Sequence, residues 1–276
     1  MCSAALSFAV MSTFAKLLGQ TMPPGEAAFF RAALTGLFVL PWALRLQSPL
    51  FGTRRAALFL RGLFGSASLI LGFYAINHLA LANAILLWQT SVFFVPLLSA
   101  LVFRERVAPA VIGYSFAAFC GCALILKPDL AIVNLGGLAA LGAGLGVALV
   151  SLTVRALHAT EHSITIIWCF GFYTSIICAL LFGGDFRAPI GQEWFYTLGI
   201  GVFGTAGQFL FTESFRHAPA GIVQPYLFLQ VVAGAALGFL AFGEVPDLAA
   251  IGGAIIVIGC GVKILSLARN PPAEEA

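Results

Sequence analysis

Four charged side chains lie within or at the edges of long apolar runs, where charge is costly and usually functional. They are Lys16, Arg31, Arg155 and Glu213. A cation at such a depth can bind a carboxylate or phosphate of a solute, and a desolvated carboxylate can carry a coupling proton. Arg31 could instead be a structural anchor, and Lys16 could extend to the membrane interface. Glu213 could belong to an interfacial cluster with Arg216 and His217, which follow it at helical spacing.

Uncharged polar and aromatic residues recur at helical spacing inside the apolar runs. Gln208 and Thr212 share one helix face, as do Tyr226 and Gln230. Such side chains either bond a neighbouring helix or line a wet cavity. As a set they suit a solute with an apolar body and a few polar groups. The predicted cavity lining is Trp88, Ser91, Gln208, Thr212, Tyr226, Gln230 and Tyr74.

The sequence contains no arrangement of residues that is typical of catalysis. A Gly-rich phosphate loop, an HExxH pattern and a GxSxG pattern are all absent. The six cysteines lie in apolar stretches without metal-ligand spacing. The basic residues form no cluster of the kind that binds nucleic acid. We therefore expect no enzyme activity, no metal and no cofactor.

The elements that must position these residues are long apolar helices. Of 276 residues, 61% are hydrophobic and 9% charged, whereas soluble domains carry about 25% charged residues. The first run has no basic leader or cleavage site, so we expect a retained span, and a short leader could precede Met1. Runs of about 20 apolar residues predict transmembrane helices. They cover residues 1–20, 24–45, 56–78, 82–103, 109–127, 134–158, 163–183, 193–215, 219–242 and 247–268.

The basic residues predict the orientation of these ten spans. With the amino terminus inside, only Lys127 and Arg187 fall in outer loops. This positive-inside bias predicts that both termini of a multi-pass protein are cytoplasmic. The basic residues at inner loops and ends are Arg45, Arg54, Arg55, Arg61, Arg104, Arg106, Arg155, Arg216, Lys263 and Arg269.

The second half of the chain repeats the first at one constant offset, the separation between His78 and His217. Five spans in each unit is an odd number, so the second unit must enter the membrane from the opposite side, as in secondary transporters. We expect residues 1–130 to form the first five-helix unit, 131–270 the second, and 271–276 a polar cytoplasmic tail. Other pairs matched by this repeat offset include Gly65 with Gly204, Ser12 with Ser151, and Lys16 with Arg155. The last two pairs suggest symmetric cationic gates at the two mouths.

Short motifs at the ends of the spans carry a family resemblance over the whole chain. They are Pro24, Glu26, Phe30-Arg31, Arg61-Gly62, Tyr74-Ala75, Leu79 to Ala82, Pro96, Arg104-Glu105-Arg106, Gly121 to Pro128, Ala218-Pro219-Ala220, Gly243-Glu244 and Gly252. In these the chain resembles the EamA-type branch of the drug/metabolite transporter superfamily. It departs from the family pattern at Leu87-Trp88-Gln89. The resemblance implies a ten-helix carrier with a cavity between its halves and with spans five and ten at the periphery.

The predicted function is secondary transport of a small metabolite, an amino acid or a related amphipathic solute, across a bacterial inner membrane by alternating access. The alternatives are uptake of nucleotide-like metabolites, broad export of drugs or amphiphiles, a non-transporting sensor and a membrane enzyme. The expected partners are the solute and the lipid bilayer, without nucleic acid. A coupling proton or counter-solute, and a monomer or a homodimer, are left open by the sequence.

Overall fold

The computed structural model describes residues 1–46, 49–79, 81–103, 108–126, 135–183, 186–218, 220–242 and 248–269, and within them the only regular structure is helical. The helices are α1 (Cys2–Leu18), α2 (Pro24–Arg45), α3 (Arg55–His78), α4 (Leu81–Trp88), α5 (Ser91–Phe103), α6 (Pro109–Leu126), α7 (Leu135–Leu157), α8 (Ser163–Phe182), α9 (Glu193–His217), α10 (Ala220–Val223), the 3-10 helix η3 (Gln224–Phe228), α11 (Leu229–Phe242) and α12 (Leu248–Arg269). The predicted all-α class is confirmed. The boundary near residue 130, the basic residues Arg104, Arg106 and Lys127, and the tail 271–276 lie outside the described residues.

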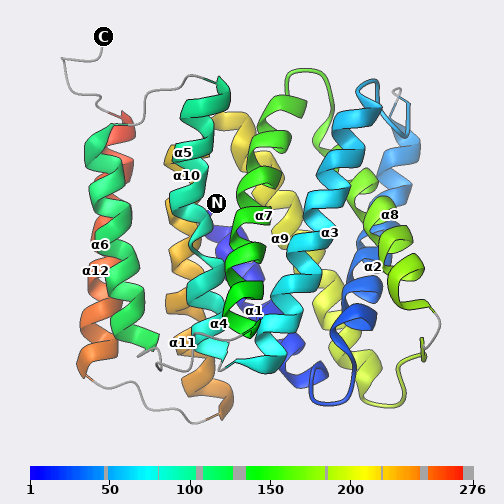
Figure 1. The fold of residues 1–276 in the computed structure, drawn as a ribbon, viewed down its shortest axis with the longest axis horizontal. Coiled ribbons are helices and arrows are strands. Elements are labelled where there is room, and N and C mark those ends of the chain that lie inside the picture. The colour runs from blue at the N-terminus through cyan, green and yellow to red at the C-terminus, as the bar shows by residue number, and fades with distance from the viewer. Residues whose placement is uncertain are drawn as a thin grey trace.

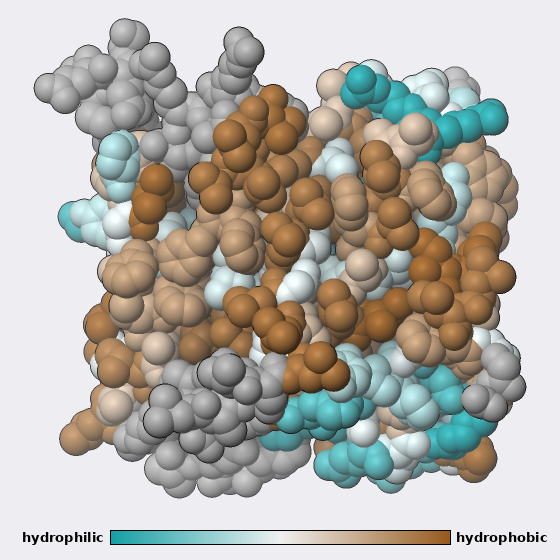
Figure 2. All heavy atoms as spheres, viewed as in Figure 1, coloured by the Kyte–Doolittle hydropathy of each residue, from teal (hydrophilic) through white to brown (hydrophobic). Residues whose placement is uncertain are grey.

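The outer surface of the bundle is apolar, as a membrane protein requires. Among the described residues, α2, α3, α7 and α8 are long and apolar enough to cross a bilayer, and shorter apolar helices accompany them. Large apolar side chains such as Leu101, Leu180 and Leu248 are exposed. Figure 2 shows hydrophobic residues across the middle of one face and hydrophilic residues toward its upper right and lower edges. This banding fits lipid around the middle and water at the ends.

Small residues let several helices approach closely. A Cβ on Gly171 of α8 would lie 2.6 Å from the backbone nitrogen of Gly36 in α2, and one on Gly121 of α6 would lie 2.9 Å from the carbonyl oxygen of Gly253 in α12. Both approaches are the packing expected where lipid offers no hydrophobic gain. Gly113, about two turns before Gly121 in α6, has nothing within 4 Å of that position, so only part of α6 approaches α12 this closely.

Helix pairs recur in the packing of the bundle (Figure 1). α1 packs on α9 and α3 packs on α7, while α2 packs on α8 and α6 on α12. The repeat offset places α1, α2, α3 and α6 on α7, α8, α9 and α12, respectively. Replacing each helix by its repeat equivalent therefore gives the same set of pairs. In Figure 1, α6 and α12 stand at one end of the bundle, and α2 and α8 stand at the other.

Two predicted continuous spans are interrupted, which corrects the expectation for spans four and nine. The span 82–103 consists of α4 and α5 with a turn at Gln89-Thr90, and the span 219–242 consists of α10, η3 and α11. At the first break Thr90 Oγ1 donates to the Leu87 carbonyl at 2.6 Å. At the second, Pro225 has no N–H to donate to a helical ladder. A bilayer demands that polar groups freed at such breaks be satisfied inside the protein.

A buried carboxylate ties two loops at one end of the bundle. Glu161, between α7 and α8, accepts from the backbone N–H of Thr53 at 2.7 Å and of Arg54 at 2.8 Å, and from Thr53 Oγ1 at 2.5 Å. Burial opposes ionisation of Glu161, but these hydrogen bonds and the charge of Arg54 outweigh it and hold its pKa below the usual value. The loop before α3 is thereby fixed to the loop before α8.

Candidate functional site

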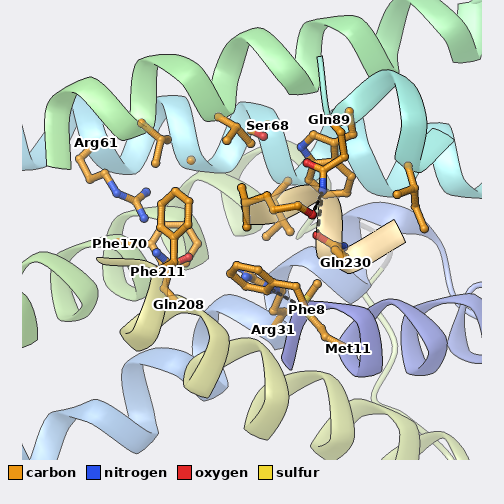
Figure 3. Close-up of a pocket in the computed structure, with 17 residues that line it drawn as sticks. Phe8, Met11, Arg31, Arg61, Ser68, Gln89, Phe170, Gln208, Phe211 and Gln230 are labelled. Atoms are coloured by element: carbon orange, nitrogen blue, oxygen red, sulfur yellow. Dashed lines mark hydrogen bonds between the residues drawn. The ribbon is translucent and has the colours of Figure 1, made fainter. Parts of the chain in front are cut away.

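A cavity of about 100 Å³ lies inside the bundle, and the two interrupted helices line one end of it (Figure 3). Its lining combines aromatic and aliphatic side chains with charged and amide groups. Among the described residues none from α6 or α12 lines it, in keeping with the peripheral position that the resemblance implied for them. The lining residues are Phe8, Met11, Arg31, Arg61, Gly65, Ser68, Leu69, Ile85, Trp88, Gln89, Val147, Val150, Phe170, Gln208, Phe211, Leu227 and Gln230.

Two buried arginines share one aromatic ring in this lining. The Cζ atom of Arg61 lies 4.5 Å from the centroid of Phe170, and that of Arg31 lies 5.5 Å from it. Arg61 is 1% exposed and Arg31 is 4% exposed. A guanidinium over an aromatic face gains cation–π energy, more so when it is desolvated.

Among the described residues, the two arginines donate few hydrogen bonds. Arg31 Nε donates to the sulfur of Met11 at 3.2 Å, and a thioether is a weak acceptor. Nε and Nη1 of Arg61 have no hydrogen-bond partner. In the part of the chain that the structure describes, neither guanidinium forms an ion pair with a carboxylate. At this end of the cavity, guanidinium N–H groups therefore lack an acceptor among the described residues.

Two glycines at equivalent positions of the repeat make room for the arginines. A Cβ on Gly65 would lie 2.5 Å from Nη1 of Arg61, and a Cβ on Gly204 would lie 3.2 Å from Nε of Arg31. Gly65 and Gly204 are separated by the repeat offset and form one of the matches by which the repeat was recognised. The packing gives that match a physical reason, because each glycine leaves the space that a guanidinium fills.

The other end of the cavity is built from amides at the helix breaks. Gln89 Nε2 donates to the carbonyl of Leu227 at 2.7 Å, so the side chain at one break satisfies the backbone at the other. The same amide lies 3.4 Å from Oε1 of Gln230, whose Nε2 donates to Ser12 Oγ at 3.2 Å. Figure 3 shows Gln89 and Gln230 together on one side of the cavity, with Arg61 and Phe170 on the other.

A second polar bridge repeats this arrangement at an equivalent place. Gln224 Nε2 donates to Ser91 Oγ at 3.2 Å, and Ser151 Oγ donates to Gln224 Oε1 at 3.2 Å. Ser91 and Ser151 are the repeat partners of Gln230 and Ser12. We call the Gln230–Ser12 contact the first bridge and the Ser91–Gln224–Ser151 chain the second bridge. Each bridge joins helices from different halves of the sequence.

The structure brings part of the predicted cavity lining together. Trp88, Gln208 and Gln230 line the cavity, as does the predicted cation Arg31. Two more predicted residues lie one contact away. Thr212 accepts from Gln208 Nε2 at 3.3 Å, and Ser91 belongs to the second bridge.

The remaining predicted site residues lie away from the cavity lining. Tyr226 donates to the carbonyl of Gly261 in α12 at 3.1 Å, and the ring of Tyr74 stacks on His78 with centroids 3.9 Å apart. Glu213 accepts from Ser163 Oγ and pairs with Arg216 at 3.3 Å and with His217 at 3.5 Å. Lys16 and Arg155 are half-buried on α1 and α7. Both of these cations lie outside the lining, although each is one helical turn from a bridge serine.

Sequence reasoning missed three residues that shape the site. Arg61 counted among the basic residues at an inner end, yet α3 begins at Arg55 and carries Arg61 nearly two turns into the buried bundle. Phe170 is the repeat partner of Arg31, so the repeat offset pointed to it. Gln89 lies in the segment where the sequence departs from the family pattern, and that departure was its only signal.

A family model described as the EamA-like transporter family matches residues 1–127 and 134–266. The chain belongs to this family. The resemblance seen in the sequence is therefore confirmed, and the family of this EamA protein is one of membrane transporters and not of enzymes.

Similar proteins are also transporters by name. The pseudopaline exporter CntI of Pseudomonas aeruginosa is 33% identical over 262 residues, which cover 93% of this chain and 92% of the relative. A riboflavin transporter of Rhizobium johnstonii is 26% identical, covering 99% of this chain and 90% of its own. Human solute carrier family 35 member G1 is 25% identical and covers 94% and 75%. A solved crystal structure with a TM-score of 0.78 and 17% identity covers 99% of both chains, which supports the fold.

Proposed function

We propose that this EamA protein is a secondary carrier that moves a small metabolite, an amino acid or a related amphipathic solute, across the bacterial inner membrane by alternating access. The observation that carries the proposal is a cavity lined at one end by two helices that are interrupted at corresponding places in the repeat. Interrupted helices in corresponding parts of two halves are the usual location of a transporter's substrate site.

Helix packing supports an inverted repeat as the basis of alternating access. The packing of α1 on α9 has its counterpart in α7 on α3, and that of α1 on α11 in α7 on α5. We infer two five-helix units, residues 1–130 and 131–270, related by a pseudo-two-fold axis in the membrane plane. The distribution of basic residues supports cytoplasmic termini. Exchange of conformation between such units would turn the cavity from one side of the membrane to the other.

The two bridges are suitable gates for this exchange. Each joins the halves through neutral hydrogen bonds, which contribute about 1 kcal/mol apiece and can be broken and remade. Lys16 and Arg155 lie one helical turn from Ser12 and Ser151. We assign these cations to guiding an anionic group past each bridge. Glu213 pairs with Arg216 and His217, which favours the interfacial cluster over a coupling role.

The mixed lining supports an amphipathic solute. Phe8, Phe211 and Trp88 provide apolar surface, while Gln208 and Gln230 provide amide groups. A cavity that is mostly apolar with a few converging polar groups selects a solute of the same character. The names of the relatives, an exporter of pseudopaline and a transporter of riboflavin, support small metabolites as the cargo.

Counterflow in proteoliposomes tests the proposal. Vesicles loaded with an unlabelled amino acid, nucleotide metabolite or amphipathic cation should transiently accumulate the labelled form of whichever solute the carrier accepts. Gln230→Ala should reduce the overshoot, whereas Phe116→Leu, on the exposed face of α6, should leave it unchanged. A protein that exchanges none of these solutes above protein-free vesicles would not be a carrier of this class.

A further inference from the structure

We propose that the solute carries two anionic groups and that Arg31 and Arg61 bind one each. The inference rests on the proposed transport function and names the substrate class of the same cavity. Its basis is the pair of buried guanidiniums in the lining, of which one, Arg61, stands outside the sequence-predicted site.

Among the described residues, the two buried arginines have no carboxylate as a counter-charge. A buried arginine without a carboxylate partner carries a desolvation cost that its hydrogen bonds must offset. Arg61 has two buried nitrogens without an acceptor, and Arg31 Nε donates to the thioether sulfur of Met11. No carboxylate in the described part of the chain forms an ion pair with either arginine. The described glutamates are Glu26, Glu161, Glu193 and Glu213. An anionic group of the solute would supply the counter-charge.

The guanidiniums of Arg31 and Arg61 belong to the lining of one cavity. Both side chains line it, and both stand over the ring of Phe170. The two Cζ atoms lie 4.5 and 5.5 Å from the same ring centroid, and both arginines line one cavity, so we infer that one small solute contacts both guanidiniums. Planar guanidinium forks bind carboxylate or phosphate through paired hydrogen bonds, which makes two such groups the matching ligand.

The end of the cavity opposite Arg61 is polar but uncharged. Gln89 and Gln230 provide amide donors and acceptors there, without charge. A solute with two anionic groups on one side and a neutral polar or aromatic body on the other would satisfy both poles. The shared chemistry is two anionic groups, which a dicarboxylate or a phosphate joined to a carboxylate can supply.

Matched solute pairs test this with the purified full-length protein. Glutamate should raise the melting temperature more than glutamine, or phosphoserine more than serine, since each pair differs mainly in the second anionic group. Arg61→Gln and Arg31→Gln should each weaken binding of the solute with two anionic groups, glutamate or phosphoserine, by at least about tenfold. Arg55→Gln, the same change at an exposed position of the same helix, should not alter it.

A second readout separates a lost site from a lost fold. Because Arg61→Gln removes a buried charge without a partner, the solute-free variant should melt at or above the wild-type temperature. Unchanged dianion binding in Arg61→Gln would overturn the proposal. Arg61→Lys, which keeps the charge and loses the fork, should bind more weakly than wild type.

The transport assay distinguishes the two levels of inference. Exchange of dianions that is lost in both arginine variants supports the site and the carrier. Exchange of neutral or cationic solutes that dianions do not inhibit would overturn the anion site and leave the carrier intact. Dianion binding without any exchange would support the site and overturn the transport function. If no dianion tested is either bound or exchanged, the anion site is overturned.

Discussion

At the scale of single residues, Phe170 occupies the repeat position of Arg31 and lies against both Arg31 and Arg61. Strict symmetry would have placed a third cation beside these two, at a high electrostatic cost. An aromatic ring at that position instead offers its negative face to both guanidiniums. The repeat has thus diverged at a position where identical residues would repel each other.

Gly65→Ala tests the space that holds Arg61. A methyl group there would lie 2.5 Å from Nη1 of Arg61 and 2.9 Å from the ring of Phe170, so both must move. We expect a destabilisation of about 1–3 kcal/mol from overpacking and a clear loss of dianion binding. Thermal melting and solute titration would measure the two effects.

Gly113→Ala is the matched control, because nothing lies within 4 Å of the added methyl group. A helical Gly→Ala change in open space should raise the stability by about 0.5–1 kcal/mol. Equal effects at residues 65 and 113 would mean that the arginine does not depend on this space.

Glu161 provides a pH-dependent prediction outside the membrane. The pKa of Glu161 is held below the usual value in the folded protein. Its ionised form therefore contributes to the free energy of unfolding above its pKa in the unfolded state. This contribution is lost as pH falls through the lower pKa of the folded state. Glu161→Gln should therefore lower stability by about 1 kcal/mol at neutral pH. The difference from wild type should disappear only at acidic pH, once the pH falls below the lowered pKa of Glu161 in the folded protein.

Melting curves of both proteins across pH would measure this difference. A gap between wild type and Glu161→Gln that stays constant down to strongly acidic pH would show that the charge of Glu161 contributes nothing to the loop contact.

At the scale of secondary structure, the interrupted ninth span supplies one glutamine to each bridge. Gln224 and Gln230 lie on η3 and α11, and each contacts a serine that also donates to the carbonyl four residues before it in α7 or α1. The first bridge therefore anchors α1, and the second anchors its repeat equivalent α7. Weakening one bridge should favour opening of the cavity at that bridge.

Alanine variants of the two glutamines should have different structural effects. Gln230→Ala should raise hydrogen exchange in α1 and α11, and Gln224→Ala should raise it in α7 and α5, since each removes contacts at one bridge only. Hydrogen exchange followed by mass spectrometry would resolve the segments. Identical exchange patterns in the two variants would contradict separate gates.

The helices themselves were largely predictable from the sequence. The expected span 24–45 coincides with α2, and the expected span 163–183 extends just past the end of α8 at Phe182, because apolar length and Pro or Gly boundaries are local signals. The breaks in spans four and nine were missed because hydropathy averages over a window longer than the break. Pro225 was a local signal for the second break, whereas Gln89-Thr90 contains neither Pro nor Gly.

The site was predictable only in part, since lining depends on helix rotation and on neighbours from the other half. Polar faces identified Gln208 and Gln230. Tyr226 shares a helical face with Gln230 only if the helix is regular, and the 3-10 geometry of η3 turns its hydroxyl toward α12. The predicted span 56–78 placed Arg61 in its second turn but not on a particular face, so a buried arginine could not be told from one that extends to the interface.

At the scale of the whole molecule, the distribution of basic residues predicts that both termini face the cytoplasm. A reporter that fluoresces only in the cytoplasm should be bright when fused to the carboxyl terminus, and one active only in the periplasm should be active when inserted at Gly191, in the loop before α9. The reverse pattern would invert the assignment of the two bridges to the two sides of the membrane.

Arg31 and Arg61, which form no ion pair with a described carboxylate, would also give the proposed carrier an electrical character. Moving one elementary charge across a potential of 100 mV changes the free energy by about 2.3 kcal/mol. A carrier that returns empty would expose two uncompensated cations to the field, whereas one loaded with a dianion would be nearly neutral. The rate of exchange of one dianion for another would then depend little on the membrane potential. The rate of net dianion transport would depend on it strongly.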